Sequence, residues 1–166
     1  MKKNISLIGM PGAGKSTIGV ILAKMIGYPF LDTDLLIQEK QGLLLSEIIE
    51  KYGVEAFLDI EEKTISQLEC KKSVIATGGS VVYKDYGMRN LKKLGYVIYL
   101  KVSYEEIEKR LENIKARGVV IEDGKNLKNL YDERAPLYEK YADIQINCDG
   151  KNIESIAEEI KIAVSK

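Results

Sequence analysis

One glycine-rich stretch near the start of the chain reads Gly9-Met10-Pro11-Gly12-Ala13-Gly14-Lys15-Ser16-Thr17. It fits the pattern G-x-x-x-x-G-K-[ST], whose backbone N–H groups surround a polyphosphate. The apolar residues 5–8 before it predict a strand, and residues 18–25 after it predict a helix. This placement favours a nucleotide-binding loop over a glycine-rich turn that matches by chance. A dinucleotide-binding loop would need a third glycine at Thr17 and would leave Lys15 without a role.

The chemistry of this stretch, called the glycine loop below, follows from its residue types. Glycines let the backbone approach a phosphate closely, and the start of the next helix adds its positive dipole end. Lys15 could reach the β- and γ-phosphates, and the Ser16 hydroxyl could hold a Mg²⁺ ion. The residues expected to bind the nucleotide are Gly12, Ala13, Gly14, Lys15, Ser16 and Thr17.

The composition indicates a globular protein of one domain, residues 1–166. Lys+Arg and Asp+Glu both count 25, so no overall basic charge recruits nucleic acid or an anionic membrane. The chain has no histidine, which argues against a zinc site or a histidine-based triad. Cys70 and Cys148 lack metal-ligand spacing and are expected to be buried thiols in a reducing compartment.

The location and assembly of the protein are expected to be simple. No signal peptide is indicated, and no apolar run is long enough to span a bilayer. We therefore expect a cytoplasmic protein with no membrane partner. A monomer is the expected state because the sequence indicates no large apolar surface.

The alternation of short apolar runs with longer amphipathic ones predicts an α/β fold, a three-layer sandwich with a five-stranded parallel sheet between helices. The predicted strands are residues 5–8, 29–31, 73–77, 96–101 and 143–148. The predicted helices are residues 18–25, 35–41, 45–52, 55–70, 104–112, 126–141 and 152–164. Ser103 and Glu106 form a predicted capping box, and Pro136 is expected to kink or restart its helix. Residues 114–125 lack periodicity and predict a mobile loop.

Three features follow predicted strands, at the sheet edge where ligands bind in such folds. They are the glycine loop, the pair Asp32 and Asp34, and Gly78-Gly79. One carboxylate could serve a metal through water while the other accepts a proton from a substrate hydroxyl. Asp34 could instead only cap the next helix. The two glycines could form a plain turn or a place where a substrate lies against bare backbone.

Two arginines are candidate binding residues. Arg117 lies inside the predicted mobile loop and is the cation best placed to arrive when a lid closes over a triphosphate. The alternative for Arg117 is an ordinary solvated side chain. Arg134 has Asp132 and Glu133 beside it in a predicted helix, which on its own indicates a surface ion pair.

Four motifs together resemble the shikimate kinase family, and the resemblance covers nearly the whole chain. The motifs are the glycine loop, Leu31-Asp32-Thr33-Asp34, Thr77-Gly78-Gly79 and Glu133-Arg134-Ala135-Pro136-Leu137-Tyr138. The resemblance implies a P-loop kinase of nucleoside-monophosphate-kinase type, with a lid over about residues 114–125. It also implies transfer of the γ-phosphoryl group of ATP to the 3-hydroxyl of shikimate.

On the nucleotide side, the resemblance implies that Lys15 and Ser16 hold ATP and Mg²⁺ and that Asp32 supports the metal. Arg117 would be the lid arginine on ATP. Lys15 and Arg117 are therefore expected to be catalytic as well as nucleotide-binding residues.

On the acceptor side, the resemblance implies that Asp34 receives the substrate hydroxyls and orients the one that attacks. Gly78 and Gly79 would contact the substrate, and Arg134 would bind its carboxylate. Asp34 is thus the third expected catalytic residue.

The chain departs from the family pattern at three places. Leu58 lies where the family has a carboxylate-binding arginine, and leucine cannot make that bidentate contact. Ser80 replaces a third glycine, and Arg117-Gly118-Val119-Val120 replaces Arg-Pro-Leu. Two alternatives therefore stay open: a kinase for another sugar acid or polyol, and a nucleotide-binding module without transfer activity.

Overall fold

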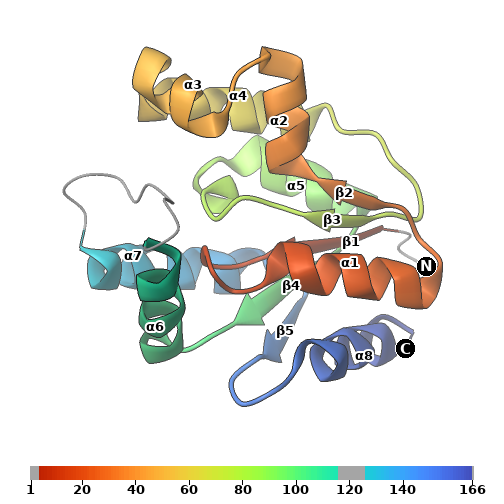
Figure 1. Cartoon of the computed structure of the whole chain (residues 1–166). Coiled ribbons are helices and arrows are strands. Elements are labelled where there is room, and N and C mark those ends of the chain that lie inside the picture. The colour runs from red at the N-terminus through yellow and green to blue at the C-terminus, as the bar shows by residue number, and fades with distance from the viewer. Residues whose placement is uncertain (1–3, 116–125, 166) are drawn as a thin grey trace.

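The structure is a computed structural model that describes residues 4–115 and 126–165. Its strands are β1 (Asn4–Ile8), β2 (Phe30–Asp32), β3 (Val74–Ala76), β4 (Gly95–Lys101) and β5 (Ile144–Asn147). They form one parallel sheet in the order β2-β3-β1-β4-β5 (Figure 1). The predicted α/β fold with five parallel strands is confirmed.

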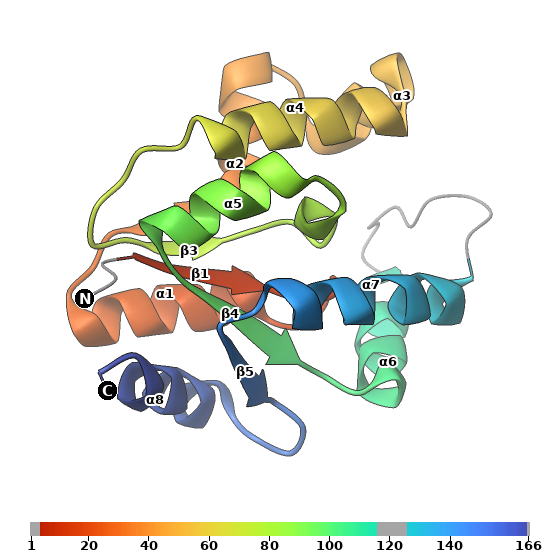
Figure 2. The same ribbon diagram turned by 180° about the vertical axis from the view of Figure 1, so that it is seen from behind.

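Helices cover both faces of this sheet. They are α1 (Lys15–Ile26), α2 (Thr33–Gln41), α3 (Leu45–Tyr52), α4 (Val54–Ser66), α5 (Asp85–Leu94), α6 (Tyr104–Lys115), α7 (Leu127–Tyr141) and α8 (Ile153–Val164). Helices α1 and α8 lie on one face, whereas α5 and α7 lie on the other (Figures 1 and 2). No helix within the described ranges is both long and apolar enough to cross a membrane.

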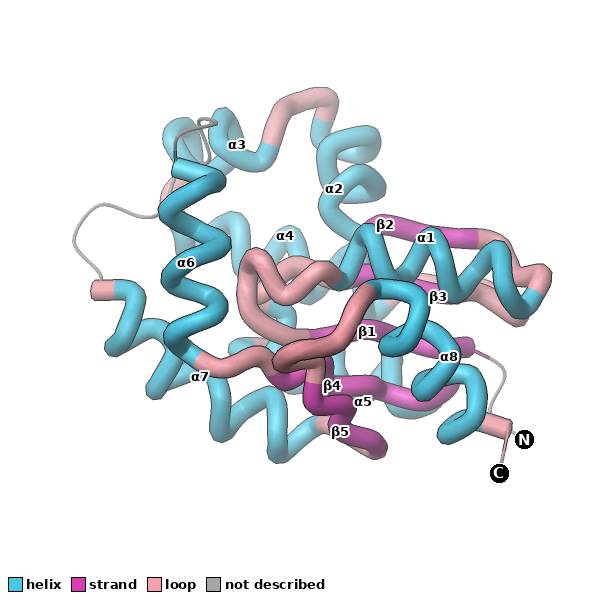
Figure 3. The backbone as a smooth tube through the Cα atoms, turned by 60° about the horizontal axis from the view of Figure 1, so that its bottom comes forward, coloured by secondary structure: helices cyan, strands magenta, loops and turns pink. Residues whose placement is uncertain are grey.

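The core lies between these layers. The central strands β1 and β4 bury almost every residue, as expected for parallel strands covered on both faces. A smaller apolar cluster, Ile37, Ile48, Phe57 and Leu58, lies among α2, α3 and α4. We call it the small cluster. It holds these three helices together as a unit. Figure 1 shows the glycine loop, which leads from β1 into α1, between this unit and α6, and Figure 3 shows α6 and α7 together at one side of the sheet.

Several predicted boundaries are wrong. Helix α4 ends at Ser66 and not at residue 70. The bounds of α7 agree with the predicted helix to within one residue, and α7 runs through Pro136 without restarting. Helix α5 and the short 3₁₀ helix Val81–Tyr83 were not predicted at all. Residues 114 and 115 belong to α6 rather than to the predicted loop. The rest of the predicted lid, including Arg117, lies outside the described residues.

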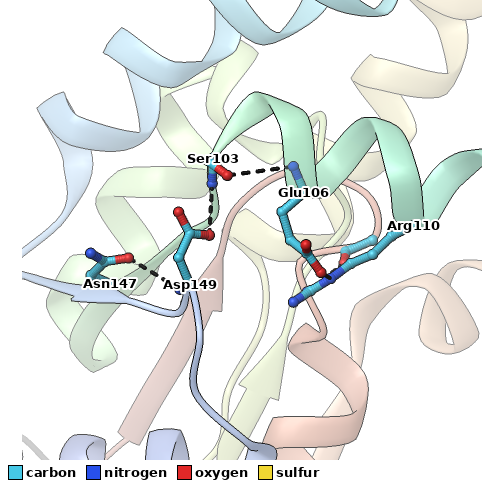
Figure 4. A network of polar contacts seen from close by, with 6 residues as sticks. Ser103, Glu106, Arg110, Asn147 and Asp149 are labelled. Carbon is cyan, nitrogen blue, oxygen red and sulfur yellow. Dashed lines mark hydrogen bonds and ion pairs between the residues drawn. The ribbon is translucent and has the colours of Figure 1, made fainter.

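The predicted capping box at the start of α6 is only half formed (Figure 4). The Ser103 hydroxyl accepts the Glu106 N–H at 3.4 Å, but the Ser103 N–H donates to Asp149 after β5 at 3.0 Å. The Glu106 carboxylate instead pairs with Arg110 Nε at 2.9 Å. Arg110 Nη1 also donates to the Gly12 carbonyl at 3.1 Å. This network ties α6 to both the β5 loop and the glycine loop.

Candidate active site

The glycine loop connects β1 to α1 at the carboxyl end of the sheet. Gly9, Gly12 and Gly14 all have positive φ angles, a region that favours glycine. A Cβ atom at Gly9 would lie 2.9 Å from the Leu100 carbonyl oxygen. Gly14 precedes α1 in a left-handed conformation, and none of the described side chains caps that helix start. The first N–H groups of α1 are therefore available to an anion.

Lys15 crosses this loop from the first turn of α1. Its Nζ donates to the Gly9 and Met10 carbonyl oxygens at 2.7 and 2.8 Å, and the residue is 8% exposed. Burial lowers the pKa of Lys15 to about 8, and the charge of Asp34 opposes that fall. The ammonium group thus stays mostly protonated at neutral pH while it is held over the loop.

Ser16 and Asp32 meet beside Lys15. The Ser16 hydroxyl donates to Asp32 Oδ2 at 2.9 Å, and Asp32 Oδ1 accepts the N–H groups of Asp34 and Leu35. Asp32 is therefore the N-cap of α2, and the alternative in which Asp34 caps that helix is wrong. The Asp34 side chain is therefore not needed to cap α2.

Two buried carboxylates meet over Gly78. A Cβ atom on Gly78 would lie 2.9 Å from both Asp34 Oδ1 and Glu61 Oε2, and neither oxygen has a hydrogen-bond partner within the described structure. Burial and the charge of Asp32 raise the pKa of Asp34. Burial raises the pKa of Glu61 to about 7, although a 2.8 Å hydrogen bond from the Ser80 hydroxyl opposes that rise. The pair is set up to accept hydrogen bonds from a ligand.

Arg134 lies on the other side of the paired glycines. A Cβ atom on Gly79 would lie 2.9 Å from Arg134 Nη1 and 2.8 Å from Pro11 Cδ. The Tyr138 hydroxyl donates to the Gly79 carbonyl at 2.6 Å and so fixes this turn against α7. Residues larger than glycine would therefore fill the space between the glycine loop and Arg134.

The structure thus brings most of the predicted site residues together. Asp34, Arg134, Asp32 and Glu61 all act electrostatically on Lys15. Gly12 and Ala13 lie in the loop, and Thr17 is exposed in the first turn of α1. Arg117 lies outside the described residues. Leu58 is 8% exposed and packs in the small cluster.

Sequence inspection missed Glu61, which is only 2% exposed. A signal was present, because Glu61 follows Phe57 by one helical turn and so continues the apolar face of α4. A carboxylate on a buried helical face needs a partner or a ligand. Tyr83 was also missed, since the segment that carries it had no predicted structure.

Comparisons with known proteins point to one family. A family model described as shikimate kinase matches residues 11–165. The shikimate kinase of Thermodesulfovibrio yellowstonii is 42% identical over 161 residues, which cover 95% of this chain and 92% of the relative. That of Clostridium botulinum is 41% identical over 164 residues, covering 97% and 96%.

Solved structures give the same result. Shikimate kinase from Acinetobacter baumannii, in complex with shikimate, matches with a TM-score of 0.89 and 32% identity over 98% of this chain and 93% of that one. A gluconokinase from Sinorhizobium meliloti matches with a TM-score of 0.58 and 16% identity, covering 99% of this chain and 92% of that one. The gluconokinase shares the fold alone.

Proposed function

The chain belongs to the shikimate kinase family, and on that premise we propose that it transfers the γ-phosphoryl group of ATP to the 3-hydroxyl of shikimate. Membership makes it an ATP-dependent phosphotransferase that acts on an alcohol group. One observation supports a polyhydroxylated acid as the phosphoryl acceptor: the unpartnered oxygens of Asp34 and Glu61 lie over Gly78, close to Lys15 and Arg134. The hydroxyl groups of such an acid can donate to Asp34 and Glu61, and its carboxylate can bind Arg134.

On the nucleotide side, we propose that the loop N–H groups and the start of α1 bind the ATP phosphates. The Lys15 ammonium group would leave the Gly9 and Met10 carbonyls and turn to the β- and γ-phosphates. Thr17, exposed beside Ser16, would extend this contact. Placing positive charge where negative charge develops is the main way in which such sites accelerate phosphoryl transfer.

The residues present fit a Mg²⁺ ion that arrives with ATP. Ser16 Oγ and Asp32 Oδ2 are adjacent oxygen donors, the kind that Mg²⁺ prefers. No group of three or more His, Cys, Asp or Glu side chains that could hold a metal ion occurs among the described residues. Phosphate oxygens and water would therefore complete the coordination of Mg²⁺. When bound, the ion would neutralise phosphate charge, and Ser16 and Asp32 would hold it.

On the acceptor side, we propose that Asp34 orients the attacking hydroxyl and takes its proton. The raised pKa of Asp34 makes that carboxylate a better proton acceptor than an exposed one. Glu61 would bind a neighbouring hydroxyl, and the bare backbone of Gly78 and Gly79 would admit the ring. Arg134 would bind the carboxylate.

The test is an ADP-release assay with a panel of acceptors that contains shikimate, other sugar acids and neutral polyols. We expect turnover with shikimate, and none with the neutral polyols. Asp34→Asn should lower kcat by roughly 10²- to 10⁴-fold while ATP binding is retained. Asp59→Asn is the matched control, because Asp59 is an exposed residue of α4 paired with Lys84. Absence of turnover with shikimate would overturn the proposal.

A second candidate acceptor is another hydroxylated acid, and Leu58 favours it. The side chain at this position is apolar and buried, so it cannot supply a second arginine contact to a shikimate carboxylate. The same panel decides, since this candidate predicts a higher kcat/KM for a different acid. A monomeric state and a cytoplasmic location stay predictions, which light scattering and cell fractionation would test.

A further inference from the structure

Arg134 does not stand alone in the acceptor site, because Tyr83 holds it. Arg134 Nε donates to the Tyr83 hydroxyl at 3.1 Å, and the guanidinium carbon lies 5.2 Å from the centre of the Tyr83 ring. The Tyr83 hydroxyl in turn donates to Glu133 Oε2 at 3.0 Å. One hydrogen bond and a cation–π contact thus act on the guanidinium group, and a second hydrogen bond orients the Tyr83 hydroxyl that accepts from it.

This contact fixes the direction of the guanidinium plane. With Nε bound to Tyr83, Arg134 directs Nη1 toward Gly79. An arginine binds a carboxylate best through two parallel N–H groups in a fixed plane. A side chain that stops rotation of this plane therefore reduces the entropy that is lost when a carboxylate binds.

Packing against neighbouring side chains holds the Tyr83 ring in place. Its ring packs against the small cluster that contains Leu58, and it ends the 3₁₀ helix that follows the paired glycines. The same short segment supplies Gly78 and Gly79 to the site and Tyr83 to Arg134. Any movement of this turn would move both together.

We propose that Tyr83 is a positioning residue that sets the affinity for the acceptor carboxylate by orienting Arg134. The inference rests on the proposed function, in which Arg134 meets that carboxylate. Position 58 is a leucine and supplies no arginine, so the alignment of Arg134 has a large effect on affinity for a carboxylate. Tyr83 acts through Arg134 and does not touch the reacting atoms.

The decisive variant is Tyr83→Phe, which keeps the ring and its packing but removes the hydroxyl. We expect the Kd and the KM for shikimate to rise roughly tenfold, with kcat and the KM for ATP nearly unchanged. A carboxamide analogue of shikimate should show no such loss, because it lacks the charge that Arg134 binds. Tyr86→Phe is the control, since Tyr86 lies three residues on and is 68% exposed.

A double-mutant cycle separates positioning from a general structural effect. Arg134→Lys keeps a positive charge but has no Nε–H group to meet Tyr83. Tyr83→Phe should therefore add nothing to Arg134→Lys. Equal, additive losses in both backgrounds, or an unchanged Kd in the single variant, would overturn the inference.

Shikimate binding measured by calorimetry without ATP keeps this inference distinct from the proposed function. If the wild type binds shikimate without turnover, the proposed function fails and the Kd values of the variants still decide the role of Tyr83. If the wild type neither binds nor phosphorylates shikimate, both are overturned. If it does both and Tyr83→Phe changes nothing, only the role of Tyr83 is lost.

Discussion

At the scale of single residues, the acceptor side of the site has two carboxyl groups that each keep one buried oxygen without a hydrogen-bond partner among the described residues. Asp34 Oδ1 and Glu61 Oε2 have no partner within the described structure, and burial raises the pKa of both carboxyl groups. A buried ionised carboxylate without donors is unfavourable, so each group gains when a ligand supplies a hydroxyl proton. The site therefore trades some stability of the ligand-free protein for acceptor binding.

Glu61→Gln should reveal this trade as a change in the pH dependence of stability. The pKa of Glu61 is about 7 in the folded protein against an ordinary value of 4.5, so the folded state keeps a proton that the unfolded chain releases. The stability from this group is present below pH 4.5 and is lost as the pH rises through 7. Glutamine cannot ionise, and we expect the variant to be about 1–3 kcal/mol more stable than the wild type at pH 8.

Urea unfolding at pH 5 and pH 8 measures this difference. The control is Glu69→Gln, because Glu69 is an exposed residue just beyond α4. The same pH dependence in Glu61→Gln and the wild type would show that Glu61 is not held protonated. The substitution should also weaken acceptor binding, since a neutral amide accepts hydrogen bonds less strongly than a carboxylate.

The individual residues that sequence analysis placed best are those in local motifs. The glycine loop and the Asp32–Asp34 pair could be predicted because their spacing along the chain determines their geometry. The sequence indicates that Glu61 lies on a buried helical face, but the contacts of Glu61 with Ser80 and of Tyr83 with Arg134 could not be predicted, because these partners lie 19 and 51 residues away. Only the packing of α4 and α7 against the turn after β3 makes these pairs.

At the scale of secondary-structure elements, α4 links the small cluster to the acceptor site. Leu58 and Glu61 are three residues apart, so they share one helical face, and both are buried. One end of this face packs among α2 and α3, while the other carries a carboxylate toward Gly78. A substitution at residue 58 should therefore alter the surroundings of the Glu61 carboxylate.

Leu58→Arg tests this coupling. An arginine three residues before Glu61 could donate to the unpartnered Oε2 and turn a second N–H group toward an acceptor carboxylate. We expect kcat/KM for shikimate to rise roughly tenfold, with the KM for ATP unchanged. The steady-state assay is run beside thermal unfolding, and Leu58→Met serves as the apolar control. No rise in a folded Leu58→Arg protein would mean that residue 58 does not limit carboxylate binding.

The helix that escaped prediction, α5, has a weak local signal. It carries Gly87 in its first turn, and glycine is a poor helix former. In the structure α5 packs against α4, where a Cβ atom on Gly87 would lie 3.4 Å from Ile65 Cγ2, an ordinary contact distance. The helix that contains Pro136 was predicted, and it continues through the proline without a restart despite the missing N–H.

At the scale of the whole molecule, one close contact sets the spacing between a helix layer and the sheet. A Cβ atom on Gly19 of α1 would lie 2.6 Å from Phe30 Cε2 and 3.4 Å from Leu7 Cδ1. Phe30 begins β2, and Asp32 ends it with the hydrogen bond from Ser16 at the start of α1. The packing distance between α1 and β2 therefore also sets the distance between two proposed Mg²⁺ ligands.

Gly19→Ala should accordingly affect both folding and nucleotide use. Alanine favours a helix over glycine by about 1 kcal/mol, but a methyl group forced against Phe30 costs about 1–3 kcal/mol. We expect a net loss of stability in urea unfolding and a KM for ATP that rises several-fold at limiting Mg²⁺. Val20→Ala, at an exposed neighbouring position of α1, should leave both unchanged. Adding Phe30→Leu to Gly19→Ala should restore both the stability and the KM for ATP, because the smaller side chain leaves room for the alanine methyl group. If Gly19→Ala alone is as stable as the wild type, the Phe30 ring moves aside and the contact does not set the spacing between α1 and the sheet.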